Sequence, residues 1–60
     1  MILRKGQMYK NKDNGFIFIT EIKGDFISVI VMSEDGYNCP EIFEYKELEE
    51  AVKEYNYTLV

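Results

Sequence analysis

Residues 16–32 read FIFITEIKGDFISVIVM, and this stretch decides the fold. The segments 16–22 and 26–32 are rich in Ile, Val, Phe and Thr, the residue types that favour β-strands. Gly24-Asp25 lies between them as a two-residue connection of the kind that closes tight hairpins. The sequence therefore predicts an antiparallel hairpin at the centre of the molecule.

The register of this hairpin divides its side chains between two faces. With Gly24-Asp25 as the loop, Ile22 pairs with Ile27, and partners across the strands share a face. We expect one face to lie inside the molecule, and it carries Phe16, Phe18, Thr20, Ile22, Ile27, Val29 and Val31. The opposite face is apolar at one end only, where it carries Ile17, Ile19, Ile30 and Met32. That apolar end needs a cover, which is either the rest of the chain or a partner.

Turn sequences on both sides of the hairpin extend the sheet. A short strand is predicted at 7–11, before Asp13-Asn14-Gly15, and a further strand within 37–45, after Asp35-Gly36. Asn-Gly and Asp-Gly favour these turns because they tolerate positive φ values. Pro40 lacks a backbone N–H, so it marks an edge, a bulge or the beginning of the later strand.

The apolar period changes to three and four residues from Lys46 onward, which predicts a short helix. Its apolar stripe consists of Leu48, Ala51, Val52 and Tyr55. Asn56 is expected as the left-handed residue at the C-terminal end of the helix, and residues 57–60 return to a strand pattern. The sequence thus predicts a mainly β fold of about five antiparallel strands with one helix, in a single domain spanning residues 1–60.

The residue inventory does not favour catalysis or metal binding. The 60 residues include no His and one Cys, so a zinc site lacks its usual ligands and Cys39 lacks a base. The carboxylates gather on the predicted helix, where they solvate the surface, and beside turn glycines. We therefore expect no catalytic residue, no metal and no cofactor. Because charge follows within the first few residues and no apolar segment reaches membrane length, we expect a cytoplasmic protein.

The net charge of −4 is distributed unevenly along the chain. Residues 1–30 carry five basic and three acidic side chains, whereas residues 31–60 carry two basic and eight acidic ones. The molecule is therefore expected to be a dipole whose acidic part repels nucleic acid and attracts basic surfaces.

Several segments together resemble a known group of proteins. They are a first strand that follows Gly6, Ile19-Thr20-Glu21-Ile22, Lys23-Gly24-Asp25, the strand 26–31, Asp35-Gly36 and the segment 41–48. Their order resembles small SH3-like β-barrel proteins, many of them products of phages and prophages of Gram-positive bacteria. The resemblance implies a small antiparallel barrel. Trp is absent and the loop at 11–15 is short, so binding of polyproline peptides is not expected.

The leading hypothesis is a non-catalytic protein-interaction module, encoded by a phage, that modulates or inhibits a host protein with a basic surface. A nucleic-acid-binding enzyme or a defence protein is a natural target, because negative charge competes with phosphate. The expected contact residues combine two tyrosines with six carboxylates: Tyr37, Tyr45, Glu34, Asp35, Glu41, Glu44, Glu47 and Glu50. We expect both tyrosines to be exposed, whereas Tyr55 is expected in the core.

Two alternatives remain open at this point. A nucleic-acid-binding accessory protein would use the basic residues Arg4, Lys5, Lys10, Lys12 and Lys23, although the acidic net charge argues against nucleic acid as a partner. A homo-oligomer would instead cover Ile17, Ile19, Ile30 and Met32 with a second copy of the chain.

Overall fold

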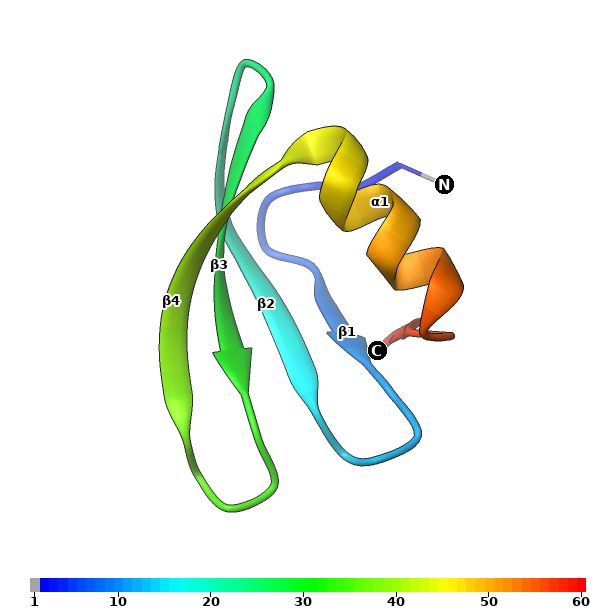
Figure 1. Cartoon of the computed structure of the whole chain (residues 1–60). Coiled ribbons are helices and arrows are strands. Elements are labelled where there is room, and N and C mark those ends of the chain that lie inside the picture. Colours follow the sequence, from blue (N-terminus) through cyan, green and yellow to red (C-terminus); the bar gives the residue numbers. More distant parts are fainter. Residues whose placement is uncertain (1) are drawn as a thin grey trace.

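The computed structural model describes residues 2–60 and consists of one five-stranded antiparallel sheet with one helix against it (Figure 1). The elements are β1 (Met8–Lys10), β2 (Phe16–Lys23), β3 (Phe26–Met32), β4 (Asn38–Glu44), α1 (Tyr45–Glu54) and β5 (Thr58–Leu59). The predicted mainly β class, with five strands and one helix, is confirmed. The strand order is β4-β3-β2-β1-β5, and the sheet is not closed into a barrel over the described residues. On this point the expected barrel is not observed.

A β-bulge in β2 decides which side chains form the core. The pairs Ile22–Ile27 and Glu21–Ser28 follow the predicted register, but Ile19 then pairs with Val29, so Thr20 is an extra residue on β2. The Thr20 hydroxyl donates a hydrogen bond to the carbonyl oxygen of Ser28 at 3.1 Å. Because side chains alternate along a strand, one extra residue exchanges the two faces of everything on its N-terminal side.

The bulge corrects the predicted inner face. Ile22, Ile27, Val29 and Val31 are buried or packed against the core as expected, but Phe16, Phe18 and Thr20 lie on the opposite face. In their place Ile17 and Ile19 enter the core, and Ile19 has no exposed surface. Ile30 and Met32 remain on the opposite face, as predicted. Uniform alternation was therefore the wrong assumption for the first half of β2.

The core lies between α1 and the sheet, on the side of the sheet that the helix covers (Figure 1). Its buried side chains are Leu3, Tyr9, Ile17, Ile19, Ile27, Val29, Leu48 and Val52. Leu48 and Val52 come from the predicted helical stripe, which is confirmed for these two residues. A helix of this length is marginal alone, so its stability comes from packing this stripe on the sheet.

The helix ends as the sequence predicts, at a left-handed asparagine. Asn56 has φ 55°, its N–H donates to the carbonyl of Lys53, and the N–H of Tyr57 donates to the carbonyl of Val52. This pair of bonds is the Schellman arrangement, which satisfies carbonyls that the last helical turn leaves free. It also turns the chain back so that β5 pairs with β1.

Tyr45 fastens the N-terminal segment to the start of α1. Its hydroxyl accepts a hydrogen bond from the N–H of Leu3 at 2.8 Å and lies 3.4 Å from the carbonyl oxygen of the same residue. The side chain of Leu3 is buried beside the helix. The segment before β1 is therefore part of the fold.

Candidate interaction surfaces

The face of the sheet opposite α1 carries a continuous apolar surface, which we call the outer face. Cross-strand pairing places eight apolar side chains on it: Met8, Phe16, Phe18, Phe26, Ile30, Met32, Pro40 and Ile42. Five of them are half-buried by their neighbours, and Phe26, Pro40 and Ile42 are exposed, with 70% of Ile42 accessible. A depression on this side of the sheet is lined by Thr20, Ser28, Val29, Ile30, Pro40, Glu41 and Ile42. An apolar surface of this extent on a small protein is typical of an interaction site.

Charged residues border the outer face on two opposite sides. The basic side consists of Arg4, Lys5, Lys10 and Lys12, which lie in β1 and its flanking segments. The acidic side consists of Glu34, Asp35, Glu41 and Glu44, which lie in β4 and in the turn before it. All eight residues are exposed. The charge division between the two halves of the chain is thus also a division across the sheet.

A hydrogen bond connects the β1–β2 turn, on the basic side of the sheet, with the β3–β4 turn, on its acidic side. The side-chain amide of Asn14, in the β1–β2 turn, donates to Glu34 in the β3–β4 turn at 3.4 Å. Both turns lie at the end of the sheet opposite the β2–β3 turn (Figure 1). Lys12 and Glu34 therefore belong to the same end of the molecule.

The free edge of β4 is interrupted by Pro40. The backbone N–H of Tyr45 donates a hydrogen bond to the carbonyl oxygen of Asp25 at 2.7 Å. Asp25 and Tyr45 are therefore a hydrogen-bonded pair at the end of the β3–β4 ladder. Hydrogen-bonded and non-hydrogen-bonded pairs alternate along such a ladder, so the Ile30–Pro40 pair is of the non-hydrogen-bonded type. In a pair of this type the backbone N–H points away from the partner strand. At position 40 it would point to the free edge of β4, and proline has no N–H there. A proline there discourages a further strand from pairing with β4.

The predicted contact residues do not form one surface. Glu34 and Asp35 lie in the β3–β4 turn, Glu44 faces the outer side of the sheet, and Glu47 and Glu50 lie on the helix. Glu41 pairs with Val29 and shares the helix side of the sheet with Tyr37 and Cys39. The structure brings Glu41 together with Tyr37 and Cys39 on the helix side of β4. Glu34, Asp35 and Glu44 lie along the same acidic side of the sheet, whereas Glu47 and Glu50 lie apart from them on α1.

The expected exposure holds for one of the two predicted tyrosines. Tyr37 is 62% exposed, as predicted, but Tyr45 is half-buried against the core and bonds to Leu3, so its predicted exposure is wrong. Tyr55 is also 62% exposed, which contradicts its predicted place in the core. Tyr55 is the C-cap of α1, where the backbone is no longer helical. Its side chain therefore does not continue the apolar side of the helix formed by Leu48 and Val52.

The Tyr37 hydroxyl lies in a row with the Cys39 thiol and the Glu41 carboxylate. The hydrogen bond to Cys39 and the nearby Glu41 charge raise the pKa of Tyr37 above its ordinary value. The Cys39 sulfur lies 3.7 Å from a Glu41 oxygen, and the thiol is free.

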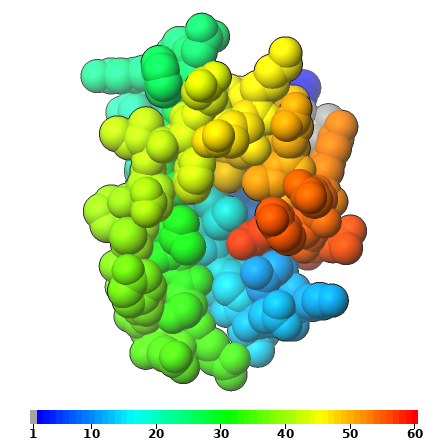
Figure 2. Space-filling model, viewed as in Figure 1, coloured from blue at the N-terminus to red at the C-terminus, as the bar shows by residue number. Residues whose placement is uncertain are grey.

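A pocket that the sequence did not reveal lies between the β1–β2 turn and the end of α1. It has a volume of about 400 Å³ and is lined by Asn11, Lys12, Asp13, Glu54, Tyr55, Asn56 and Tyr57. In Figure 2 the last helical turn and the residues after it (orange to red) lie against the β1–β2 turn (blue). We call this the tyrosine pocket.

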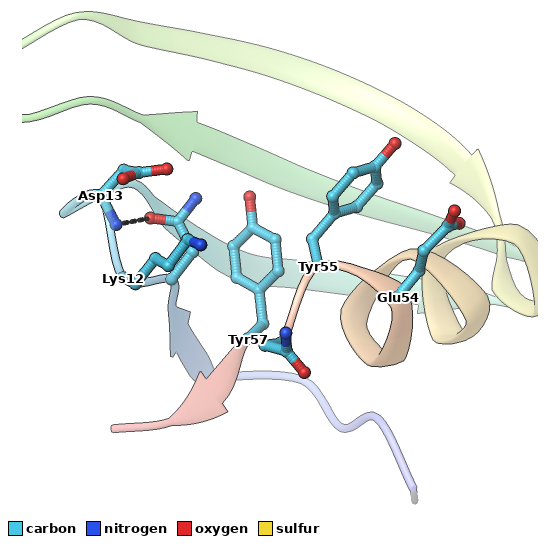
Figure 3. Close-up of a pocket in the computed structure, with 7 residues that line it drawn as sticks. Lys12, Asp13, Glu54, Tyr55 and Tyr57 are labelled. Atoms are coloured by element: carbon cyan, nitrogen blue, oxygen red, sulfur yellow. Dashed lines mark hydrogen bonds between the residues drawn. The ribbon is translucent and has the colours of Figure 1, made fainter.

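Two rings and two carboxylates define the chemistry of the tyrosine pocket. Figure 3 shows the rings of Tyr55 and Tyr57 side by side, with their hydroxyls toward the same side. Asp13 lies beyond Tyr57 and Glu54 beyond Tyr55 (Figure 3). Aromatic faces and carboxylates both favour a cation. The sequence feature that points to this pocket is Asn56. It ends the helix in the left-handed conformation, and its two neighbours, Tyr55 and Tyr57, line the pocket.

Asn11 shapes the wall of this pocket that the β1–β2 turn provides. Its side-chain oxygen accepts hydrogen bonds from the N–H of Asp13 at 2.9 Å and of Gly15 at 2.8 Å. Asn14 completes the turn in the left-handed region, with φ 61°. A Cβ on Gly15 would lie 3.0 Å from the Asn11 amide nitrogen, so the side chain of Asn11 occupies the space that any other residue at position 15 would need.

The residues predicted for a homo-oligomer are divided between the core and the outer face. Ile17 and Ile19 are buried under α1, whereas Ile30 and Met32 lie on the outer face. The outer face, which the helix does not cover, carries Phe16 and Phe18 at the places expected for Ile17 and Ile19. Of the basic residues predicted for nucleic acid, four form the basic side of the sheet and Lys23 lies at the far end of β2.

Within residues 2–60, no group of three or more Cys, Asp or Glu side chains is placed to hold a metal ion. α1 has ten residues, and none of the helices in the described part of the chain has the length and apolar composition to cross a bilayer. Comparison of the chain with protein-family models, with curated proteins and with solved structures found no match. The functional argument therefore rests on the surfaces of this chain.

Proposed function

We propose that this protein is a non-catalytic binding module that recognises a basic segment of a partner protein. The observation that carries the proposal is the tyrosine pocket, in which Tyr55 and Tyr57 stand between the carboxylates of Asp13 and Glu54. A Lys or Arg side chain that enters the pocket meets aromatic faces and negative charge together. An exposed cation–π contact of this kind contributes about 0.5–1 kcal/mol, so several contacts are needed for useful affinity.

The acidic helix supports the same partner class. Glu47, Glu49, Glu50 and Glu54 on α1 outnumber Lys46 and Lys53. Their field extends over about one Debye length, roughly 8–10 Å at physiological salt, and draws a basic segment toward the pocket. Lys12 also lines the pocket and opposes an entering cation, but Asp13 and Glu54 leave the charge of the lining at −1.

An NMR titration tests this proposal. The probes are a ten-residue peptide of alternating Lys and Gly and a matched peptide of alternating Glu and Gly, each added to isotopically labelled protein. We expect the basic peptide to shift the amide signals of residues 11–13 and 54–57, and the acidic peptide to leave them in place. Equal effects of both peptides, or shifts confined to other residues, contradict the proposal.

Two tyrosines with equal exposure provide a matched pair of variants. Tyr55→Ala removes one ring of the pocket, and Tyr37→Ala removes an equally exposed ring immediately before β4. We expect Tyr55→Ala to weaken binding of the basic peptide by roughly three- to fivefold, which corresponds to one exposed cation–π contact. Tyr37→Ala should leave the affinity unchanged. A loss of affinity in Tyr37→Ala alone would move the site to the row on β4.

The fold supports a more specific architectural proposal, an SH3-like module. Four strands follow one another as neighbours, the helix comes next, and β5 returns to pair with β1. The β-bulge at Thr20 in β2 is a feature of the kind that bends a strand and lets a small sheet curve around one core. A host protein with a basic surface, met by a phage product in the cytoplasm, remains the proposed setting, and the half-buried free Cys39 suits a compartment that keeps thiols reduced.

A further inference from the structure

We propose that a second copy of this chain covers the outer face, so that two sheets pack face to face around a two-fold axis parallel to their strands. The proposed dimer uses the outer face, whereas the tyrosine pocket lies between the β1–β2 turn and the end of α1, and the two surfaces share one residue, Lys12. The inference rests on the apolar content of the outer face and on the distribution of charge around it.

One row across the outer face carries no charged side chain: Met8, Phe18, Ile30 and Pro40. The rows on either side each contain one charge, because Lys10 pairs with Phe16 and lies over its ring, and Glu21 pairs with Ser28. Lys23 and Glu44 lie with Phe26 at the β2–β3 end of the face. Two such uncharged rows can be pressed together without burying an unpaired charge, which would otherwise oppose the contact. A net charge of −4 on each copy therefore does not prevent association here.

The basic side and the acidic side of the sheet carry opposite charges. This charge complementarity favours one of the two possible two-fold axes in the plane of the interface. A two-fold axis along the strands places β1 of one copy over β4 of the other and keeps like ends together. The basic side of each copy then meets the acidic side of the other, and the contact is reciprocal, as a two-fold interface requires. In particular, Lys10 and Lys12 of one copy approach Glu34 and Asp35 of the second.

The other in-plane axis gives the opposite result. A two-fold axis perpendicular to the strands places β1 over β1 and β4 over β4. Lys10 and Lys12 then meet Arg4 and Lys5, and the two acidic sides also face each other. Like charges at these positions destabilise the arrangement. Charge therefore distinguishes two dimers that bury the same apolar side chains.

A dimer of standard size would cover a limited share of the surface of each copy. A standard interface buries roughly 800 Å² on each partner, which is about a fifth of the 4380 Å² that this chain exposes. The outer face is one of the two broad faces of the five-stranded sheet, whose strands contain 27 residues. Packed sheets keep their strands within about 30° of each other, so an axis near the strand direction suits this geometry. Pro40 on the free edge directs association to the face and away from strand addition.

Sedimentation velocity over a range of concentrations tests the dimer. We expect the unmodified chain to change from monomer to dimer as concentration rises. Ile42→Asp and Ile30→Asp place a charge on the outer face without touching the core cluster, and each should raise the dimer dissociation constant by at least tenfold while the circular dichroism spectrum is retained. Glu47→Lys on α1 is the matched control, and it should leave the dissociation constant unchanged.

A charge exchange tests the axis. Lys10→Glu with Lys12→Glu in one chain, and Glu34→Lys with Asp35→Lys in another, should each weaken self-association. An equimolar mixture of the two variants should recover a dimer that contains one copy of each. A monomer at every concentration, or a dimer unaffected by Ile42→Asp, would overturn the proposal. Dimers that persist in both charge variants without preferring the mixture would overturn the axis.

Discussion

The backbone N–H of Leu3 donates a hydrogen bond to the hydroxyl of Tyr45 at 2.8 Å, across 42 residues of sequence. This contact joins the segment before β1 to the first residue of α1, and it holds the buried side chain of Leu3 under the helix. The polar end of Tyr45 thus serves the fold, although its sequence position beside Glu44, at the end of a strand, suggests a surface role.

Tyr45→Phe should lower the free energy of unfolding by about 1 kcal/mol, the usual contribution of one hydrogen bond. The ring remains in place, so the loss reports the bond between Tyr45 and Leu3. Urea denaturation measures it. Tyr55→Phe removes a hydroxyl from an exposed ring and is the control, with an expected change within about 0.5 kcal/mol. Equal effects in the two variants would assign no special role to the Leu3 contact.

Neighbouring residues of β2 should differ strongly in their cost of truncation. Ile19→Ala removes a side chain with no exposed surface and should destabilise the fold by about 2–5 kcal/mol. Phe18→Ala removes a larger but half-buried side chain from the outer face and should cost less than Ile19→Ala. Chemical denaturation at low protein concentration, where a dimer does not contribute, makes the comparison. The reverse order would show that the strand follows the register without the bulge.

Asn11 and Gly15 should behave as a coupled pair. Asn11→Ala loses two hydrogen bonds to backbone N–H groups and should cost about 1–2 kcal/mol. Gly15→Ala should also destabilise, because its Cβ would lie 3.0 Å from the Asn11 side chain. In the Asn11→Ala background that obstruction is absent, so the second substitution should cost less. A double-mutant cycle measures the coupling, and strictly additive effects would contradict it.

Pro40→Val should increase association through the edge of β4. Valine supplies the N–H that proline lacks and favours an extended strand, so the free edge becomes able to pair with another strand. Light scattering during prolonged incubation measures the growth of large species. Ile42→Val, an apolar exchange at a position that already has its N–H, is the control. If both variants behave like the unmodified chain, the proline does not protect this edge.

Alkaline pH should destabilise the fold through Tyr9. Burial, with a smaller effect of the neighbouring Tyr45, raises the pKa of Tyr9 above its ordinary value of 10.0. The folded state therefore holds its proton more tightly than the unfolded chain does. The resulting stability is present below pH 10 and is lost as the pH rises from there through the folded-state pKa. Urea denaturation between pH 8 and 11 should show this decline.

Tyr9→Phe separates this effect from other alkaline titrations. The variant loses a hydrogen bond from the Tyr9 hydroxyl to Gln7, so it starts from a lower stability at neutral pH. Its decline above pH 10 should be shallower than that of the unmodified chain. Parallel declines would show that Tyr9 is not the group responsible.

The sequence predicted the elements of this fold better than their faces. Gly24-Asp25 and the two apolar segments were sufficient to identify the hairpin, and Leu48 and Val52 the packed side of the helix. The bulge at Thr20 left no comparable signal, because Phe16 and Phe18 are as apolar as Ile17 and Ile19. Periodicity cannot choose between two apolar faces, so the choice depended on a local irregularity of the backbone.

The candidate site was harder to predict, for a related reason. The tyrosine pocket joins residues 11–13 to residues 54–57, and no local pattern indicates that these segments meet. The predicted contact set relied instead on acidic residues that are close in sequence. The structure spreads them over a turn, a strand and a helix, because neighbours along a strand point to opposite faces. Asn56 indicates where the helix ends, but its residue type does not indicate that the preceding Tyr55 is exposed beside the β1–β2 turn.

The bulge at Thr20 also governs how relatives of this chain should be aligned. A gap of one residue placed anywhere between positions 16 and 20 would equate core positions of one sequence with surface positions of the other. A substitution in this segment affects one position. A single insertion or deletion exchanges core and surface positions for every residue of β2 that precedes it. Homologues that share the core should therefore vary in length at the turns and keep the spacing between Ile17, Ile19 and Ile22.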